Sequence, residues 1–309
     1  MRSSAARFNL NTGGGLLAIV LWSSTIAVAR SLSEQLGPLT AGAAVYLIAG
    51  ALCLAHLARS KTSIAQLLRL PGKYLLGCGI LFAVCNVSLF LAVGQARDRA
   101  QVLEIGLINY LWPAATILLS VPLLNKRANL WLLPGTALAL AGVFLVMTQG
   151  ARVSWHAFAG HLRSNPMAYA LALAAAVTWA FYSNLVRRWS GAGGDGAAEL
   201  FIPATGLVLL VIRLLWPEPT LWSTQVVVEA VALGGITAVA YVLWDAAMRK
   251  GDLLFVAACS YFTPLLSTLV TCAYLNVAPG YQLWAGCAAI VLGSLVSWRS
   301  LLDDAKERH

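Results

Sequence analysis

Hydrophobic residues form long runs along this chain, and short polar breaks separate the runs. Each run is close to the ~20 residues that a helix needs to cross the hydrocarbon core of a bilayer. The pattern therefore predicts an all-α polytopic membrane protein with ten transmembrane helices. We place the ten runs at about 13–30, 38–58, 74–95, 100–122, 131–149, 166–186, 199–216, 228–248, 253–275 and 281–299.

The composition agrees with this pattern. Hydrophobic residues make up 60% of the 309 residues and charged residues only 11%, whereas a soluble domain has about 25% charged residues. Too few charged side chains are present to cover a water-soluble core, and the high hydrophobicity excludes a disordered chain. Ten spans also leave little sequence for a separate soluble domain.

The net charge of +9 follows from 21 Lys and Arg against 12 Asp and Glu. Ten spans place both termini on one side of the membrane. If that side is the cytoplasm, 15 of the 21 basic residues lie in cytoplasmic segments and 6 on the other side, as the positive-inside rule requires. We expect a bacterial-type inner (plasma) membrane protein with both termini cytoplasmic. The bilayer then explains the positive charge without nucleic acid, and no obligate protein partner is evident.

Landmark residues of the first half recur in the same order in the second half. The string Tyr110–Pro113 matches Tyr261–Pro264 at an offset of 151 residues. The same offset relates two glycine pairs, and offsets of 157 and 155 relate residues nearer the start of each half. These further pairs are Gly135 with Gly286, Gly142 with Gly293, Trp22 with Trp179, Arg30 with Arg187, and Ala83-Val84 with Ala238-Val239.

We therefore expect two five-helix repeats, residues 1–150 and residues 151–309. Five is an odd number, so the two copies must cross the membrane in opposite directions. Inverted repeats of this kind are typical of secondary transporters, whose substrate site lies near the bilayer midplane between the repeats.

Three strings resemble a known family. They are AIVLWSS from Ala18, QVLEIGLINYLWP from Gln101 and SYFTP from Ser260. They are similar to the drug/metabolite transporter superfamily of the EamA type, and closer still to YddG-type aromatic amino-acid exporters. The resemblance covers nearly the whole chain. It implies ten helices in two inverted repeats around a central cavity, and export of amino acids from the cytoplasm.

Two repeat-related prolines, Pro113 and Pro264, fall inside predicted spans. A proline removes an N–H and clashes with the carbonyl four residues earlier, here that of Asn109 and of Ser260. In a bilayer the freed carbonyl must find a neighbour or face a wet cavity. Either the paired kinks line the cavity or act as hinges, or they are structural kinks that are repaired locally.

Mid-span aromatic and polar residues are the candidates for substrate contact. Tryptophans at this depth could form a stacking wall around a substrate side chain, or could simply pack in the core. Asn86 and Tyr241 are polar, related by the 155-residue offset, and could bind the substrate's amino or carboxylate group. The predicted substrate-binding residues are Trp22, Ser23, Asn86, Gln101, Asn109, Tyr110, Trp112, Trp179, Tyr182, Tyr241, Ser260 and Tyr261.

Aromatic residues near span ends are typical of the belt that anchors a protein at the membrane interface. Their indole and phenol groups place an apolar ring beside a polar tip, which suits the headgroup region. The residues assigned to this belt are Tyr74, Trp131, Trp155, Trp189, Trp216, Trp222, Trp284 and Trp298.

Few ionisable residues fall within the spans. Glu104 could carry a coupling proton, but it could also be solvated near the mouth or paired with Arg97 or Arg99. Asp245 lies four residues before Arg249, a spacing that favours an ion pair on one helix face. The histidines of segment 150–165 lack a carboxylate or cysteine at metal-ligand spacing, so we expect no metal and no cofactor.

The favoured function is a secondary transporter that exports neutral, aromatic or large apolar amino acids by alternating access. A phosphorylated cargo would need mid-span Lys or Arg, which the spans lack. The alternative is another small metabolite or drug handled by the same superfamily. An intramembrane enzyme would need a motif such as HExxH, GxGD or GxSxG, and the sequence contains none; the chain is therefore not expected to be an enzyme.

Overall fold

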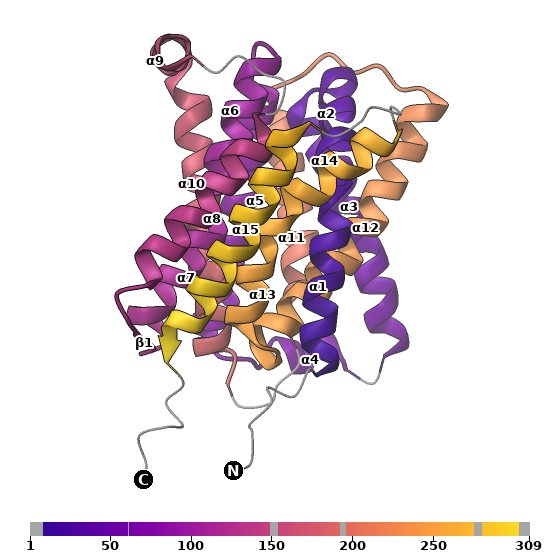
Figure 1. Cartoon of the computed structure of the whole chain (residues 1–309). Coiled ribbons are helices and arrows are strands. Elements are labelled where there is room, and N and C mark those ends of the chain that lie inside the picture. Colours follow the sequence, from indigo (N-terminus) through magenta and orange to yellow (C-terminus); the bar gives the residue numbers. More distant parts are fainter. Residues whose placement is uncertain (1–8, 61, 149–153, 192–195, 275–279, 303–309) are drawn as a thin grey trace.

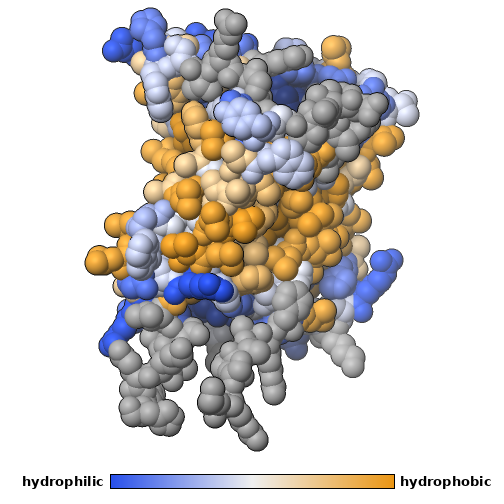
Figure 2. Space-filling view, viewed as in Figure 1, coloured by the Kyte–Doolittle hydropathy of each residue, from blue (hydrophilic) through white to orange (hydrophobic). Residues whose placement is uncertain are grey.

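The computed structural model describes residues 9–60, 62–148, 154–191, 196–274 and 280–302. The chain forms an elongated bundle of helices, and α1 begins on the face where α15 ends (Figure 1). We call this the terminal face. Apolar side chains form a wide band around the middle of the bundle, and hydrophilic side chains gather above and below it (Figure 2). This distribution is that of a polytopic membrane protein.

Among the described residues, seven helical segments are long and apolar enough to cross a bilayer. The chain is thus an all-α membrane protein with seven candidate spans, or eight when the bent pair α1–α2 counts as one. Two shorter apolar helices, α8 (Leu132–Met147) and Leu253–Leu269, accompany them. The seven are α3 (Pro38–Arg59), Lys73–Gly94, Ala100–Leu123, α10 (Pro166–Trp189), α11 (Ala198–Leu215), α12 (Thr224–Lys250) and α15 (Tyr281–Ser300).

The predicted first span, 13–30, is not one straight helix. It is split at Ser24 into α1 (Leu10–Ser23) and α2 (Thr25–Leu36), which are bent by 49°. The hydroxyls of Ser23, Ser24 and Thr25 donate to the carbonyls of the three residues from Val20 to Trp22. Such side-chain bonds compete with the backbone ladder and bend helices, a consequence that the hydrophobic pattern does not reveal.

The segments that contain the paired prolines are broken as well. The first consists of α6 (Arg99–Asn109) and α7 (Trp112–Leu123), and the second of α13 (Leu253–Cys259), a 3₁₀ turn η2 (Ser260–Phe262) and α14 (Thr263–Tyr274). Pro113 and Pro264 each stand second in the helix after the break, where a missing N–H is tolerated. The expected mid-helix kinks are therefore interruptions, and each proline begins a new helix.

Smaller elements lie at the two faces. Segment Lys73–Gly94 begins with a π-helical turn, η1 (Lys73–Cys78), followed by α5 (Gly79–Gly94). The sequence pattern did not predict α4 (Ile64–Leu67) or α9 (Trp155–Ser164). The strands β1 (Arg127–Ala128) and β2 (Leu301–Leu302) pair antiparallel at the terminal face. The expected repeat boundary between residues 150 and 151 lies outside the described residues.

Candidate functional site

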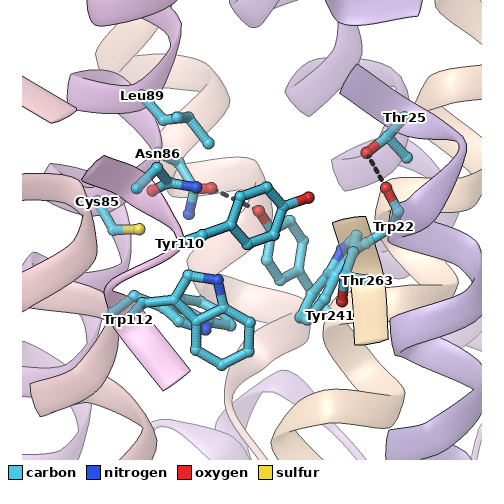
Figure 3. Close-up of a pocket in the computed structure, with 11 residues that line it drawn as sticks. Trp22, Thr25, Cys85, Asn86, Leu89, Tyr110, Trp112, Tyr241 and Thr263 are labelled. Atoms are coloured by element: carbon cyan, nitrogen blue, oxygen red, sulfur yellow. Dashed lines mark hydrogen bonds between the residues drawn. The ribbon is translucent and has the colours of Figure 1, made fainter. Parts of the chain in front are cut away.

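A cavity lies inside the bundle, between the two halves of the chain (Figure 3). Its two adjoining parts have a volume of about 120 Å³ each and share seven lining residues. The second part continues along α2, α5 and α6 towards the face opposite the terminal face. The deeper part is lined by Trp22, Thr25, Cys85, Asn86, Leu89, Asn109, Tyr110, Trp112, Trp179, Tyr241 and Thr263.

Aromatic rings form the deep wall of this cavity. The ring of Trp22 lies 5.6 Å from that of Trp179 and 5.3 Å from that of Tyr241, between ring centroids. Trp112 is perpendicular to Trp179 at 6.3 Å. Below them Trp244, fully buried, contacts all three tryptophans at 5.1–5.8 Å. Edge-to-face pairs of this kind are rigid and favourable, so the wall is shaped in advance for a flat or bulky apolar group.

Three polar side chains at the cavity are bonded to one another. The hydroxyls of Tyr46 and Tyr241 both lie 2.5 Å from Asn86 Oδ1, and 3.0 Å from each other. Asn86 Nδ2 donates to the carbonyl of Phe82 at 2.8 Å. Both hydroxyl protons are used within this trio of Tyr46, Asn86 and Tyr241, which joins α3, α5 and α12.

Other polar groups at the cavity have no such partner. The hydroxyl of Thr263 is buried and makes no hydrogen bond within the part of the chain that the structure describes. The hydrogen bonds of the described residues likewise leave the Asn109 carboxamide and the Tyr110 hydroxyl unused, and in Figure 3 the Tyr110 ring extends across the cavity towards Thr25. Buried polar groups are rarely left unpaired, so these groups are suited to a ligand.

The structure brings seven of the predicted substrate-binding residues to the cavity wall and places five elsewhere. Ser23 and Ser260 donate to carbonyls of their own helices, and Gln101 bonds to the backbone of Arg97 and to Asn165. Tyr182 and Tyr261 are fully buried in hydrophobic clusters. The seven at the cavity are Trp22, Asn86, Asn109, Tyr110, Trp112, Trp179 and Tyr241.

Sequence reasoning missed Tyr46 and Thr263 at the cavity. Each is a hydroxyl residue in the middle of an apolar run, a signal available from the sequence but shared by many buried Thr and Tyr residues. Thr263 also stands in the repeat position of Trp112, so its role differs from that of its counterpart. Thr25, Cys85 and Leu89 line the wall without any sequence signal that separates them from packing residues.

A buried polar network surrounds Asp245, which together with Arg249 also lines a separate pocket of about 190 Å³. Its carboxylate is 1% exposed and accepts hydrogen bonds from Arg249 Nε at 2.7 Å, from the Tyr182 hydroxyl at 3.1 Å and from the Tyr74 hydroxyl at 3.2 Å. The Tyr74 hydroxyl accepts from the Ala197 N–H at 2.9 Å. The expected Asp245–Arg249 ion pair is confirmed, and the network joins η1, α10, α11 and α12.

The assignment of Tyr74 to the interfacial belt is wrong, because the tyrosine is fully buried in this network. The apolar flank of Tyr74 packs on Phe201 at 5.7 Å. Five of the predicted belt tryptophans are more than half exposed, as a belt requires. These five are Trp131, Trp155, Trp216, Trp222 and Trp284.

Glu104 has other partners than those expected. Its carboxylate lies 3.1 Å from His161 Nδ1 and accepts a hydrogen bond from the Tyr169 hydroxyl, and it makes no contact with Arg97 among the described side chains. The side chain of Arg99, the other expected partner, lies outside the described residues. The contact joins α6, α9 and α10 beside a groove of about 290 Å³ between α6, α8 and α9, away from the central cavity. His161 is thus partly buried.

The chemistry of the central cavity is neutral. Its lining contains no Asp, Glu, Lys, Arg or His in either part. Within the described residues, no group of three His, Cys, Asp or Glu side chains could hold a metal ion. Aromatic rings, two carboxamides and several hydroxyls remain, which can bind an uncharged or zwitterionic molecule with an apolar part.

Comparisons with known proteins agree with this picture. The sequence pattern of the EamA-like transporter family matches residues 13–148. The chain is 31% identical to the aromatic amino acid exporter YddG of Escherichia coli K12, over 92% of this chain and 95% of the exporter. It is 32% identical to that of Ancylobacter novellus, with the same coverage. An uncharacterized inner membrane transporter of Escherichia coli, YedA, is 26% identical.

A solved structure also matches. A protein crystal structure with 29% sequence identity superposes with a TM-score of 0.76, covering 94% of this chain and 98% of the other. The similarity extends over both halves of the chain, so the whole fold is shared.

Proposed function

Because the chain belongs to the EamA-like transporter family, and is a transporter and not an enzyme, we propose that it exports neutral amino acids with aromatic or large apolar side chains across a bacterial inner membrane. The observation that carries this proposal is a cavity with aromatic walls, a few hydroxyl and amide groups and no charged side chain in its lining. Other small metabolites or drugs of similar chemistry are the alternative. The relatives named as aromatic amino acid exporters favour amino acids.

The packing supports two inverted five-helix repeats, 1–150 and 151–309, with α8 and the α13–α14 segment completing ten spans. Helix α8 packs on α15, and α3 packs on α11, so each of these pairs joins two repeat equivalents. Helix α1 packs on α12, and the equivalent helices α10 and α5 also pack on each other. Exchanging each helix for its repeat equivalent reproduces the same set of pairs. The pattern is that expected of two copies related by a two-fold axis in the membrane plane.

Two repeat-related arginines support the same symmetry. Arg30 Nη1 donates to the carbonyl of Val93 at 2.9 Å, and Arg187 Nε donates to the carbonyl of Met248 at 2.7 Å. The arginines are 157 residues apart and the carbonyls 155, the two offsets found in the sequence. One contact lies near the terminal face and the other at the opposite face, as inversion requires.

The repeat-related glycines face one another across α8 and α15. A Cβ atom at Gly142 would lie 2.7 Å from the carbonyl oxygen of Gly286, and one at Gly293 would lie 2.7 Å from that of Gly135. Side chains are excluded at such distances, so the glycines permit the close approach of the two helices.

We place the terminal face in the cytoplasm, so that the cavity extends towards the outside and the Asp245 network closes the cytoplasmic side. Export requires this network to open while the other side closes, in an alternating-access cycle. The two helix breaks at Pro113 and Pro264 lie where the halves meet and lack a continuous backbone ladder, which supports a hinge role. No coupling ion is assigned.

Efflux from liposomes tests the function. The purified protein is reconstituted into vesicles loaded with one labelled amino acid, such as phenylalanine, tryptophan, leucine or serine, and efflux is compared with protein-free vesicles. We expect efflux of the aromatic and large apolar amino acids and little of serine. The absence of efflux for every neutral amino acid would overturn the proposal.

A further inference from the structure

Three hydrogen-bonding side chains of the cavity lining stand at the two helix breaks. Thr263 is the first residue of α14, is 4% exposed, lines the cavity and has a hydroxyl without a partner in the described chain. Asn109 and Tyr110 stand at the other break, directly before α7, and line the same cavity. Two 12-residue helices thus begin where three hydrogen-bonding side chains are left free.

Such an arrangement favours a negative group. Helix N-termini carry a partial positive charge, which attracts carboxylates. In these two helices the second residue is a proline without an N–H, and the Thr263 N–H donates to the Ser260 carbonyl, so side chains have to supply the hydrogen bonds. Hydroxyl and amide side chains can donate to the same oxygens. Because the cavity lining has no Lys or Arg, these neutral donors are its means of holding an anion.

The bonded polar cluster at the same cavity is unsuited to an anion. In the trio of Tyr46, Asn86 and Tyr241, both hydroxyl protons are directed within the trio. The hydroxyl oxygens therefore present lone pairs to the cavity and repel a carboxylate, whereas they can accept from an ammonium group. The cavity thus has a donor side at the helix breaks and an acceptor side at the trio.

We propose that Thr263, Tyr110 and Asn109 form a carboxylate subsite, and that this subsite makes the transporter select a free α-carboxylate. The apolar side chain then lies against Trp22, Trp112 and Trp179, which line the same cavity. This inference rests on the proposed function, since it concerns recognition of the amino acid that the transporter carries.

Binding to the detergent-solubilised full chain tests the subsite separately from transport. L-leucine and L-leucinamide both carry an ammonium group and the same side chain, but only leucine has a carboxylate. Neither absorbs near 280 nm, so quenching of the cavity tryptophans reports their binding. We expect the wild type to bind leucine at least tenfold more tightly than leucinamide, because a hydrogen bond to a charged group is among the stronger ones.

Substitutions at Thr263 and Tyr110 test whether these side chains cause the preference for leucine over leucinamide. Thr263→Val keeps the shape of the side chain and removes the hydroxyl, and Thr263→Ser keeps the hydroxyl as a control. We expect Thr263→Val to reduce leucine affinity about tenfold and to leave leucinamide affinity unchanged, with Thr263→Ser close to wild type. We expect Tyr110→Phe, like Thr263→Val, to reduce the affinity for leucine and to leave that for leucinamide unchanged.

The subsite would be overturned if the wild type bound leucine and leucinamide equally well. It would also be overturned if Thr263→Val reduced the affinity for both ligands by the same factor. The subsite would also be overturned if folded Thr263→Val and Tyr110→Phe proteins both kept the wild-type ratio of leucine to leucinamide affinity. Failure of the proposed function looks different, since it is the absence of efflux from liposomes by the wild-type protein whatever the binding preference.

Discussion

The two ends of the central cavity differ in how their buried polar groups are satisfied. At the closed end, the Asp245 carboxylate has three protein donors, and Tyr74 is in turn bonded to the backbone of Ala197. At the cavity itself, the hydroxyl of Thr263 has no partner among the described residues. Protein contacts therefore stabilise the closed end, whereas the cavity keeps hydrogen-bonding capacity for a molecule that the protein binds.

This difference has a consequence for the transport cycle. A buried ion pair is costly to break, because each ion left behind stays poorly solvated. The closed end therefore opens only when water or other groups replace the lost partners. The groups at the helix breaks carry no such cost, because the Thr263 hydroxyl has no partner within the described chain before the substrate arrives.

The largest expected effect follows from disrupting the closed end. Asp245→Ala leaves Arg249 without the carboxylate in a buried site, which typically costs about 3–5 kcal/mol. We expect the terminal face to open and Cys78, fully buried beside this network, to become accessible. In a background where the other cysteines are serine, maleimide labelling of Cys78 should accelerate at least tenfold.

The matched control for this change is the double variant Asp245→Asn with Arg249→Gln. It removes both charges of the pair, so no cation loses its carboxylate, and labelling should rise much less. Equal labelling rates in the wild type and Asp245→Ala would contradict the sealing role of the network.

The next effect concerns the wall between the two ends. Trp179 contacts Trp22, Trp112 and Tyr182, and Trp179→Ala removes the central ring of the wall. We expect the preference for aromatic over small amino acids, measured as relative efflux, to fall about tenfold. Trp216→Ala, on a tryptophan that is 63% exposed, serves as the control. If a folded Trp179→Ala protein keeps the wild-type substrate preference, the aromatic wall does not select the substrate.

A smaller effect tests the symmetry of the two ends. Arg30→Ala and Arg187→Ala each remove a charged hydrogen bond to a helix carbonyl, a contribution of about 1.5–3 kcal/mol. Both should lower the thermal unfolding temperature. Arg187→Ala should lower it more, because the second bond of Arg187, to the carbonyl of Gly251, is partly buried, whereas the second bond of Arg30, to Glu34, is exposed. If neither change alters the unfolding temperature, the two arginine contacts no longer support an inverted repeat.

The smallest effect is expected at Glu104, which lies outside the cavity and is bonded to His161 and Tyr169. Glu104→Gln keeps the shape of the side chain and removes its charge. We expect efflux to stay within about twofold of wild type, with or without a pH gradient, because Glu104 lines a groove away from the central cavity. If efflux depends on the gradient in the wild type and loses that dependence in Glu104→Gln, Glu104 couples transport to protons.

Part of the site followed from residue type and depth in the chain. Trp22, Trp179, Asn86 and Tyr241 were recognisable as mid-span residues, and all four meet at the cavity. The residue pattern did not distinguish Tyr110 from Tyr261, which occupy the same position in the two repeats. Tyr110 reaches the cavity, whereas Tyr261 is buried in a cluster between α8, α13 and α15. Residue type is the same at both positions, so only packing separates their roles.

The sequence alone determined the class of the protein, because hydrophobicity, charge distribution and repeat offsets are properties of residue order. It also predicted the i,i+4 pair of Asp245 and Arg249, whose geometry is local to one helix. The tertiary structure decided which side chains meet. The burial of Tyr74, the contact between Glu104 and His161, and the unpaired Thr263 hydroxyl all depend on residues distant in the chain, and hydrogen bonds between helices leave no periodic trace in the sequence.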